Sequence, residues 1–185
     1  VHRLPDFDPR AIPVLGVDAH LPAVPAAQQT AQALRERFRA PPVWAPEIAS
    51  EKRFSERAPA RASVLLPIVQ RDQPMVLLTE RTLHLSTHSG QVAFPGGRAD
   101  PGDSSPADTA LREAQEEVGL ERRFVEVLGS LPTYQTGSSF IITPVVALVR
   151  PDCLLHPNPY EVASIFDLPL AFLLDPAHHQ RHAVE

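Results

Sequence analysis

The sequence predicts an α+β fold in which a mixed β-sheet is covered by helices. Apolar runs that are typical of strands occur on both sides of a helical segment at 105–119. Strands and helices do not alternate strictly along the chain, which disfavours a doubly wound parallel sheet. A hydrophobic fraction of 43% in 185 residues is enough for the core of one domain with some additional segments.

The first 60 residues are expected to form a proline-rich arm with one helix, attached to a main domain of residues 61–185. Prolines recur throughout residues 1–25 and prevent a long helix there, so this stretch is expected to be extended. Apolar residues at helical spacing predict a helix over residues 26–39, which the following Pro-Pro pair ends. Residues 44–60 are polar and broken, as in a linker or an exposed turn.

The main domain contains several segments with the valine, isoleucine and leucine content of strands. The expected strands are 62–70, 74–80, 91–94, 124–131 and 140–149. A short apolar stretch follows at 162–166, and residues 169–174 are expected to form the first turn of a last helix. The histidine-rich end beyond Pro176 is expected to be frayed.

Charge and composition exclude several classes of function. A net charge of −5 disfavours a general nucleic-acid binder, which is usually basic. The single cysteine, Cys153, excludes an intrachain disulfide and is typical of a reducing compartment. We find neither an apolar run long enough to span a membrane nor a signal segment. We therefore expect a cytoplasmic protein that binds neither nucleic acid nor membranes, as a monomer or a homodimer.

The helical segment carries an acidic face next to an apolar stripe. At about 100° per residue, Glu113, Glu116 and Glu117 share one face. Their mutual repulsion, and their position near the helix C-terminus, are unfavourable in a bare helix. A Mg²⁺ or Mn²⁺ ion reverses both penalties, because hard cations bind carboxylate oxygens. Arg112 precedes Glu116 by four residues and can orient that carboxylate. The alternative is an ordinary solvated acidic face.

The segment that runs from the turn at Phe94 to Leu120 resembles the Nudix box, G-x5-E-x7-R-E-U-x-E-E-x-G-U, in which U is aliphatic. The first half departs from the pattern, because Asp103 stands at the Glu position counted from Gly97 and the arginine follows one residue late. The second half matches at Arg112, Glu113, Ala114, Glu116, Glu117, Gly119 and Leu120.

An upstream motif resembles the signature of the Nudix coenzyme A diphosphatases, L-L-T-x-R-[SA]-x3-R-x3-G-x3-F-P-G-G. It matches from Leu77 to Gly97, except that Thr82 replaces Ser or Ala and Ser86 replaces the second Arg. The resemblance implies a Nudix-type α/β/α sandwich with a mixed sheet and a loop-helix-loop. It also implies hydrolysis of the diphosphate linkage of coenzyme A, or of its thioesters or oxidised form, to 3′,5′-ADP and 4′-phosphopantetheine.

The resemblance implies roles for the acidic residues and the glycines. Glu113 and Glu117 are expected to bind the metal ion, and Glu116 to be a third ligand or to orient water. One of these carboxylates is expected to act as general base. Gly96 and Gly97 are expected to let backbone groups approach the metal or phosphate, where a Cβ would clash.

Five further residues are candidates for the site. Arg81 and Arg98 are candidates for phosphate contacts, with ordinary solvent exposure as the alternative. Glu161 is a candidate auxiliary ligand or base, because in the Nudix fold a carboxylate from outside the box often completes the site. His88 is a candidate for the lining of the substrate pocket, and Arg112 is expected to orient other groups.

Other interpretations remain open at this point. Ser86 in place of Arg keeps another Nudix substrate possible, such as ADP-ribose or NADH. A non-catalytic nucleotide-binding module and an acidic surface without metal are further alternatives. His84 and His88 lack the Glu of a metalloprotease motif, and the C-terminal histidines are expected to lie in a polar tail.

Overall fold

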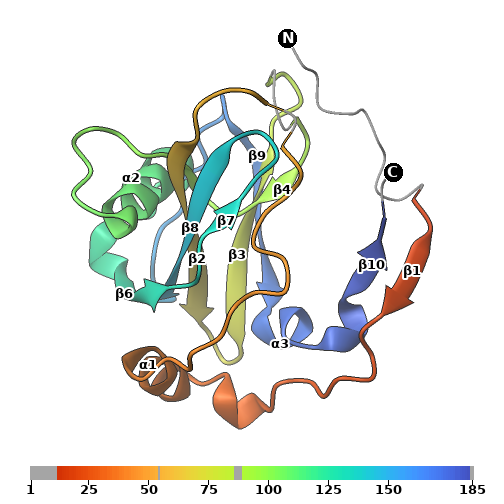
Figure 1. The fold of residues 1–185 in the computed structure, drawn as a ribbon. Helices are drawn as coiled ribbons and strands as arrows, with labels where there is room; N and C mark the ends of the chain where they lie inside the picture. The colour runs from red at the N-terminus through yellow and green to blue at the C-terminus, as the bar shows by residue number, and fades with distance from the viewer. Residues whose placement is uncertain (1–11, 54, 86–88, 184–185) are drawn as a thin grey trace.

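A computed structural model describes residues 12–53, 55–85 and 89–183 of the protein (Figure 1). Within these ranges its centre is a sheet of eight strands. The strands β2 and β8 are parallel and the other pairs of this sheet are antiparallel, so the predicted mixed sheet is confirmed. The strands are β2 (Ala60–Gln70), β3 (Pro74–Arg81), β4 (Val92–Ala93), β5 (Gly96–Arg98), β6 (Val125–Ser130), β7 (Tyr134–Gln135), β8 (Phe140–Val149) and β9 (Val162–Pro169).

The strands β2 and β3 separate, and the segment that follows them in sequence fills the gap. β2 pairs with β3 only at residues 68–70, beside the hairpin turn, and with β5 at residues 62–64. β3 continues past β2 and pairs with β4 at its far end. Pro95 lies between β4 and β5, and its carbonyl accepts the N–H of Leu65 of β2 (2.8 Å). The turn expected at 94–97 is therefore built into the sheet, with its second half forming a strand.

The helix α2 (Pro106–Val118) covers one face of the sheet. The hydroxyl of Ser105 accepts the N–H of Asp108 (3.1 Å) and starts the helix, while Gly119 ends it at φ 70°, a conformation that favours glycine. Ala110, Ala114 and Val118 are fully buried against β2 and β8. The predicted limits and apolar stripe of this helix are confirmed.

The opposite face is covered by α1 (Ala31–Arg39) and the single turn α3 (Leu170–Leu173). The helix expected over 26–39 is wrong in its first turn, where a separate 3-10 turn, η2 (Ala26–Gln28), precedes α1. Thr30 interrupts the two, because its hydroxyl accepts the N–H of Ala33 (3.2 Å) and so starts a new helix.

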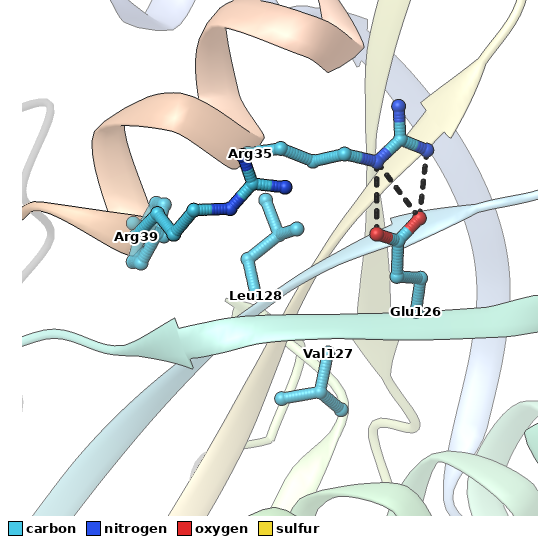
Figure 2. A pocket seen from close by; sticks show the side chains of 6 residues that line it. Arg35, Arg39, Glu126, Val127 and Leu128 are labelled. Atoms are coloured by element: carbon cyan, nitrogen blue, oxygen red, sulfur yellow. Dashed lines mark hydrogen bonds and ion pairs between the residues drawn. The ribbon is translucent and has the colours of Figure 1, made fainter.

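Figure 2 shows how α1 lies along β6. Arg35 of α1 forms a bidentate ion pair with the carboxylate of Glu126, in which Nε donates to Oε1 (2.8 Å) and Nη2 donates to Oε2 (2.7 Å). Phe38 lies against Gly129, where a Cβ would stand only 2.9 Å from the ring. β6 is irregular beside this glycine, since its register with β8 shifts between Val127 and Gly129. The helix α1 can therefore pack closely on β6 because the ring of Phe38 occupies the space that a side chain at residue 129 would need.

The strands β1 and β10 form a small ribbon that stands apart from the main sheet (Figure 1). β1 (Val14–Val17) pairs with β10 (Gln180–His182), and Arg181 donates to the carboxylate of Asp18 (2.9 Å). The expected frayed end beyond Pro176 is wrong, because a 3-10 turn, η4 (Pro176–His178), leads into this ribbon. Pairing between residues so distant in sequence gave no local signal.

The segment expected as a linker over 44–60 is in part tied to the domain. Its Ser50 forms a bridge with Gln135 of β7. The carboxylate of Glu51 accepts the hydroxyl of Tyr134 (2.9 Å) and the N–H of Gly137 (2.8 Å). Residues 50 and 51 are exposed, as expected, but these long-range bonds attach them to the main sheet.

Two element limits near the sheet also differ from expectation. β6 begins at residue 125, after the 3-10 turn η3 (Arg122–Phe124), and β9 extends to Pro169, beyond the short apolar stretch 162–166. β9 is long because it pairs with most of β3. None of the helices in the described ranges combines the length and the apolar character that crossing a bilayer requires.

Candidate active site

The carboxylate of Glu117 lies between α2 and the turn that joins β4 to β5. Its side chain is only 6% exposed. The N–H of Gly96 donates to Glu117 Oε2 (3.0 Å), and Nη1 of Arg81 lies 3.5 Å from Oε1. The last turn of α2 is therefore joined to two strands through one buried carboxylate.

The carboxylate of Glu113 lies directly over Gly97, one helical turn before Glu117. A Cβ on Gly97 would stand 2.5 Å from the carboxyl carbon of Glu113, so only glycine leaves room for this carboxylate. The side chain of Glu113 is 16% exposed, and Nη1 of Arg112 lies 3.0 Å from its Oε1.

Gly96 allows two strands to pack closely. A Cβ on Gly96 would stand 2.4 Å from the carbonyl oxygen of Ser63 and 2.6 Å from the Cα of Val64. The missing side chain thus allows β5 to approach β2, and the N–H of Gly96 remains free to bind Glu117. At Gly97 it is instead the carboxylate of Glu113 that occupies the space of the missing Cβ.

Arg112 connects the loop before α2 with the acidic face. Its Nε and Nη2 donate to the two carboxylate oxygens of Asp103 (3.1 Å each), and Nη2 also donates to the carbonyl of Arg98 (3.0 Å). Nη1 donates to Glu116 (3.1 Å), as the spacing predicts. Sequence reasoning missed the partnership with Asp103, although the position of Asp103 in the motif was the available signal.

Glu116 differs from the other two acidic residues of the helix. Its side chain is 58% exposed, whereas those of Glu113 and Glu117 are largely buried. Its contact is with Arg112, on the side of α2 where Arg122 and Gln115 line a shallow hollow. The three carboxylates share a helix face, but the sheet covers only two of them.

Glu161 joins the buried pair from a loop distant in sequence. The N–H of Asn158 donates to the carbonyl of Glu117 (2.8 Å), so the loop before β9 is attached to the end of α2. Burial is the main cause of the raised pKa of Glu113 and Glu117, and the negative charge of Glu161 adds a smaller contribution in the same direction. The structure thus holds the loop that carries Glu161 against the end of α2 and the end of β3.

Burial determines the electrostatics of this cluster. It raises the pKa of Glu117 to about 7, although the N–H of Gly96 and the charge of Arg81 oppose the shift. It also raises the pKa of Glu113, against the opposing effect of Arg112. In contrast, hydrogen bonds from Arg112 hold the pKa of Asp103 well below its usual range. Asp103 is a structural anion, whereas Glu113 and Glu117 lack full compensation.

Arg81 is directed into the site by an irregular end of the sheet. The register between β3 and β9 shifts after Glu80, so that Arg81 lies opposite Val162. Its Nε is buried and makes no hydrogen bond to any residue in the described ranges. Arg98 differs, since its side chain is exposed and its carbonyl binds Arg112. A buried donor without a partner makes Arg81 the stronger candidate for binding an anion.

The remaining candidates lie elsewhere or outside the described residues. His88 and Ser86 belong to the part of the chain that the structure does not describe. Nε2 of His84 lies 3.4 Å from the hydroxyl of Thr82, a contact within the loop after β3. Cys153 packs at the edge of the core beside α2.

The arrangement combines acidic and basic groups at one sheet opening. Two buried carboxylates and a third nearby one can bind a hard cation or accept a proton, and Arg81 can bind an oxyanion. In residues 12–53, 55–85 and 89–183, no three acidic, histidine or cysteine side chains are already gathered as a ready set of metal ligands. Glu113 and Glu117 contact Arg112 and Arg81 instead.

Known sequences resemble the larger part of this chain. A family profile described as the NUDIX domain matches residues 59–182. A protein described as an uncharacterized Nudix hydrolase, NudL, of Yersinia enterocolitica is 53% identical over 109 residues, which are 59% of this chain and 56% of the relative. Its namesake from Photorhabdus laumondii is 49% identical over 120 residues, 65% of this chain and 64% of the relative. The chain thus matches less than two thirds of these relatives' length.

Solved structures of low sequence identity share the fold. A binary complex of a C. elegans Ap4A hydrolase superimposes with a TM-score of 0.51 at 17% identity, covering 65% of this chain and 87% of that chain. The Nudix hydrolase RenU of M. smegmatis gives 0.50 at 24% identity, covering 66% and 79%. The family profile spans well over half of the chain and the fold agrees with it, so this protein belongs to the NUDIX family.

Proposed function

We propose that this protein hydrolyses the diphosphate linkage of coenzyme A, or of its thioesters or oxidised form, in a reaction that depends on Mg²⁺ or Mn²⁺. The observation that carries the proposal is the pairing of Glu117 with Arg81 and the placement of Glu113 over Gly97, with the loop of Glu161 bound to the end of α2. Carboxylates and an arginine at one opening suit a substrate whose two phosphates carry dense negative charge.

The donors fit a hard divalent cation. Burial raises the pKa of Glu113 and Glu117, which means that their negative charges lack full compensation. We assign the ion to Glu113 and Glu117, with Gly97 offering its backbone and Glu161 or Glu116 as a third ligand. When bound, such an ion lowers the pKa of water and neutralises phosphate charge. The exposure of Glu116 makes it better suited to orienting water than to direct ligation.

The chain's own residues would then position the substrate and move a proton. Arg81 offers its buried Nε to a phosphate oxygen, and Arg98 adds positive charge at the exposed rim. One of the carboxylates accepts the proton of the attacking water. Arg112 stays bound to Asp103 and fixes the direction of Glu113 and Glu116.

The identity of the substrate rests on the sequence of the strands that form the opening. β3 contributes Leu77-Leu78-Thr79 and Arg81, and residues 94–97 follow in the register of the coenzyme A diphosphatase signature. The products would be 3′,5′-ADP and 4′-phosphopantetheine. Ser86 in place of the second Arg favours a second candidate, hydrolysis of another nucleoside diphosphate derivative such as ADP-ribose.

Hydrolysis of a substrate panel tests the proposal. We expect coenzyme A to be cleaved ahead of ADP-ribose, NADH and nucleoside triphosphates in the presence of Mg²⁺ or Mn²⁺, and EDTA to abolish turnover. Glu117→Gln should lower kcat by roughly 10³-fold or more, because it removes a ligand charge. Equal turnover of ADP-ribose would reject coenzyme A as the specific substrate. Binding of nucleotide without turnover of any substrate would indicate a non-catalytic module.

The proposal also covers the compartment, the partners and the domain boundaries of the enzyme. We place the enzyme in the cytoplasm, acting on a small molecule rather than on nucleic acid or membranes, as a monomer or a homodimer. We retain residues 1–60 as an arm packed on a catalytic domain of residues 61–185. The match of the family profile from residue 59 supports this boundary.

A further inference from the structure

The loop that carries Glu161 is fastened to α2 on one side. The N–H groups of His156 and Asn158 donate to the carbonyls of Val118 and Glu117 (2.8 Å each). These carbonyls belong to the last turn of α2, where helical partners are missing. The loop therefore takes its position from the helix that carries Glu113 and Glu117.

On its other side the same loop is fastened to the end of β3 by Thr82. The N–H of Thr82 donates to the carbonyl of Glu161 (3.0 Å), and its hydroxyl donates to the carbonyl of Tyr160 (3.0 Å). Thr82 is only 7% exposed, so these bonds are largely shielded from water. Its hydroxyl also lies 3.4 Å from Nε2 of His84, a longer contact.

The bulge between β3 and β9 explains why the side chain of Thr82 is needed to hold the loop that precedes β9. The regular ladder of β9 ends at Val162, opposite Arg81, after the register has shifted. Beyond that point the N–H of Thr82 still donates to the carbonyl of Glu161. The carbonyl of Tyr160 lies past the ladder, and the threonine hydroxyl takes the place of a strand hydrogen bond.

We propose that Thr82 is a positioning residue, whose hydroxyl fixes the Tyr160-Glu161 peptide and so sets the carboxylate of Glu161 relative to Glu113 and Glu117. This inference rests on the proposed function, in which Glu161 serves the hydrolytic site. Thr82 itself touches neither substrate nor metal in this role. It acts through the backbone of the two residues it holds.

Two substitutions separate the hydroxyl from the rest of the side chain. Thr82→Val keeps the shape and the backbone bond to Glu161 but removes the donor to Tyr160. Thr82→Ser keeps the donor and loses only a methyl group. We expect Thr82→Val to lower kcat about tenfold with KM within twofold of the wild type, because misplacing a catalytic group lowers the rate more than binding. Thr82→Ser should restore most of kcat.

A double-mutant cycle distinguishes positioning from a merely structural role. Glu161→Gln should lower kcat by itself, and Thr82→Val should then have no further effect in the Glu161→Gln background. An equal loss in both backgrounds would overturn the proposal, as would a wild-type rate in Thr82→Val or in Glu161→Gln.

The two hydrogen bonds by which Thr82 holds residues 160 and 161 are called the clamp. Amide hydrogen exchange tests the clamp without any turnover. Exchange in residues 158–161 should be faster in Thr82→Val than in the wild type or Thr82→Ser, because the loop loses a fixed point. Unchanged exchange would overturn the clamp even if the enzyme is active. A wild type that hydrolyses no diphosphate would instead overturn the proposed function and, with it, the catalytic role of the clamp.

Discussion

The helices α1 and α2 cover opposite faces of the sheet and begin in the same way, yet the candidate site lies on the side of α2. A Thr hydroxyl caps α1 and a Ser hydroxyl caps α2. Each helix places an arginine against a carboxylate, Arg35 against Glu126 and Arg112 against Asp103. Of the nine residues of α1, all of which the structure describes, none is fully buried, whereas α2 buries five.

The difference lies in how deeply the charges are placed. Arg35 and Glu126 are 42% and 50% exposed, and such surface pairs contribute little to stability. Asp103 and Glu117 are 8% and 6% exposed, so water cannot replace their partners. Helix formation follows local rules on both faces. The face covered by α2 shields carboxylates from water, whereas the ion pair on the α1 face stays exposed.

The glycines on the two faces offer the comparison with the largest expected effect. Gly97→Ala would push a Cβ into the carboxylate of Glu113, and Gly129→Ala would push one toward the ring of Phe38. We expect Gly97→Ala to lower kcat/KM about 100-fold, because a displaced ligand misplaces the reaction. Gly129→Ala should cost about 1 kcal/mol of unfolding free energy and leave kcat/KM unchanged.

Turnover assays and urea unfolding of the two variants measure these effects. Gly102→Ala is the matched control for Gly97→Ala, since no atom lies within 4 Å of its added Cβ, and Gly16→Ala is the corresponding control for Gly129→Ala. Equal losses of activity in Gly97→Ala and Gly129→Ala would remove the functional distinction between the two faces.

The two arginines provide a second, smaller contrast. Arg112→Met leaves Asp103 without its main partner and frees Glu113 and Glu116, so kcat should fall at least tenfold and the midpoint of thermal unfolding should decrease. Arg35→Met removes only an exposed pair with Glu126, and its kcat should equal that of the wild type. Steady-state kinetics and thermal melts test both. A full rate in Arg112→Met would show that orientation by this arginine is unnecessary.

The pH dependence of stability should have opposite signs on the two faces when EDTA removes metal ions. Burial raises the pKa of Glu117 from 4.5 to about 7. Between these values the unfolded protein has lost the proton of this carboxyl group while the folded protein still binds it, so the folded state becomes less stable as pH rises. The free energy of unfolding of the wild type should therefore fall by about 3 kcal/mol relative to Glu117→Gln between these pH values.

Glu126 should behave in the reverse sense. Its hydrogen bond with Arg35 lowers its pKa from 4.5, so its contribution to stability is present above this value and is lost as pH falls below it. The wild type should lose stability relative to Glu126→Gln only on that acidic side. Urea titrations of the three proteins from pH 4 to pH 8 compare the trends. A gap between wild type and Glu117→Gln that does not change with pH would contradict the burial of an uncompensated carboxylate.

Local signals predicted much of the fold and part of the candidate site. The limits of α2, the strands around it and the nearness of Glu113 to the glycine turn follow from periodicity, caps and spacing. Errors occurred where partners are distant in sequence, as in the pairing of β1 with β10 and in the bonds of Glu51 to β7 and the loop after it. The apolar or acidic face of a helix can be predicted from residues close in sequence, but the pairing of β1 with β10 cannot.

The sequence by itself determined the family resemblance, the acidic helix and the glycines, because each of these depends on residues a few positions apart. Only the tertiary structure decided which acidic residues are buried. It separates Glu116, which stays in water, from Glu113 and Glu117, and it holds the loop of Glu161, a candidate already named from the sequence, between α2 and Thr82. The reason is physical: desolvation and orientation depend on which surfaces meet across the sheet, and spacing along the chain does not specify that.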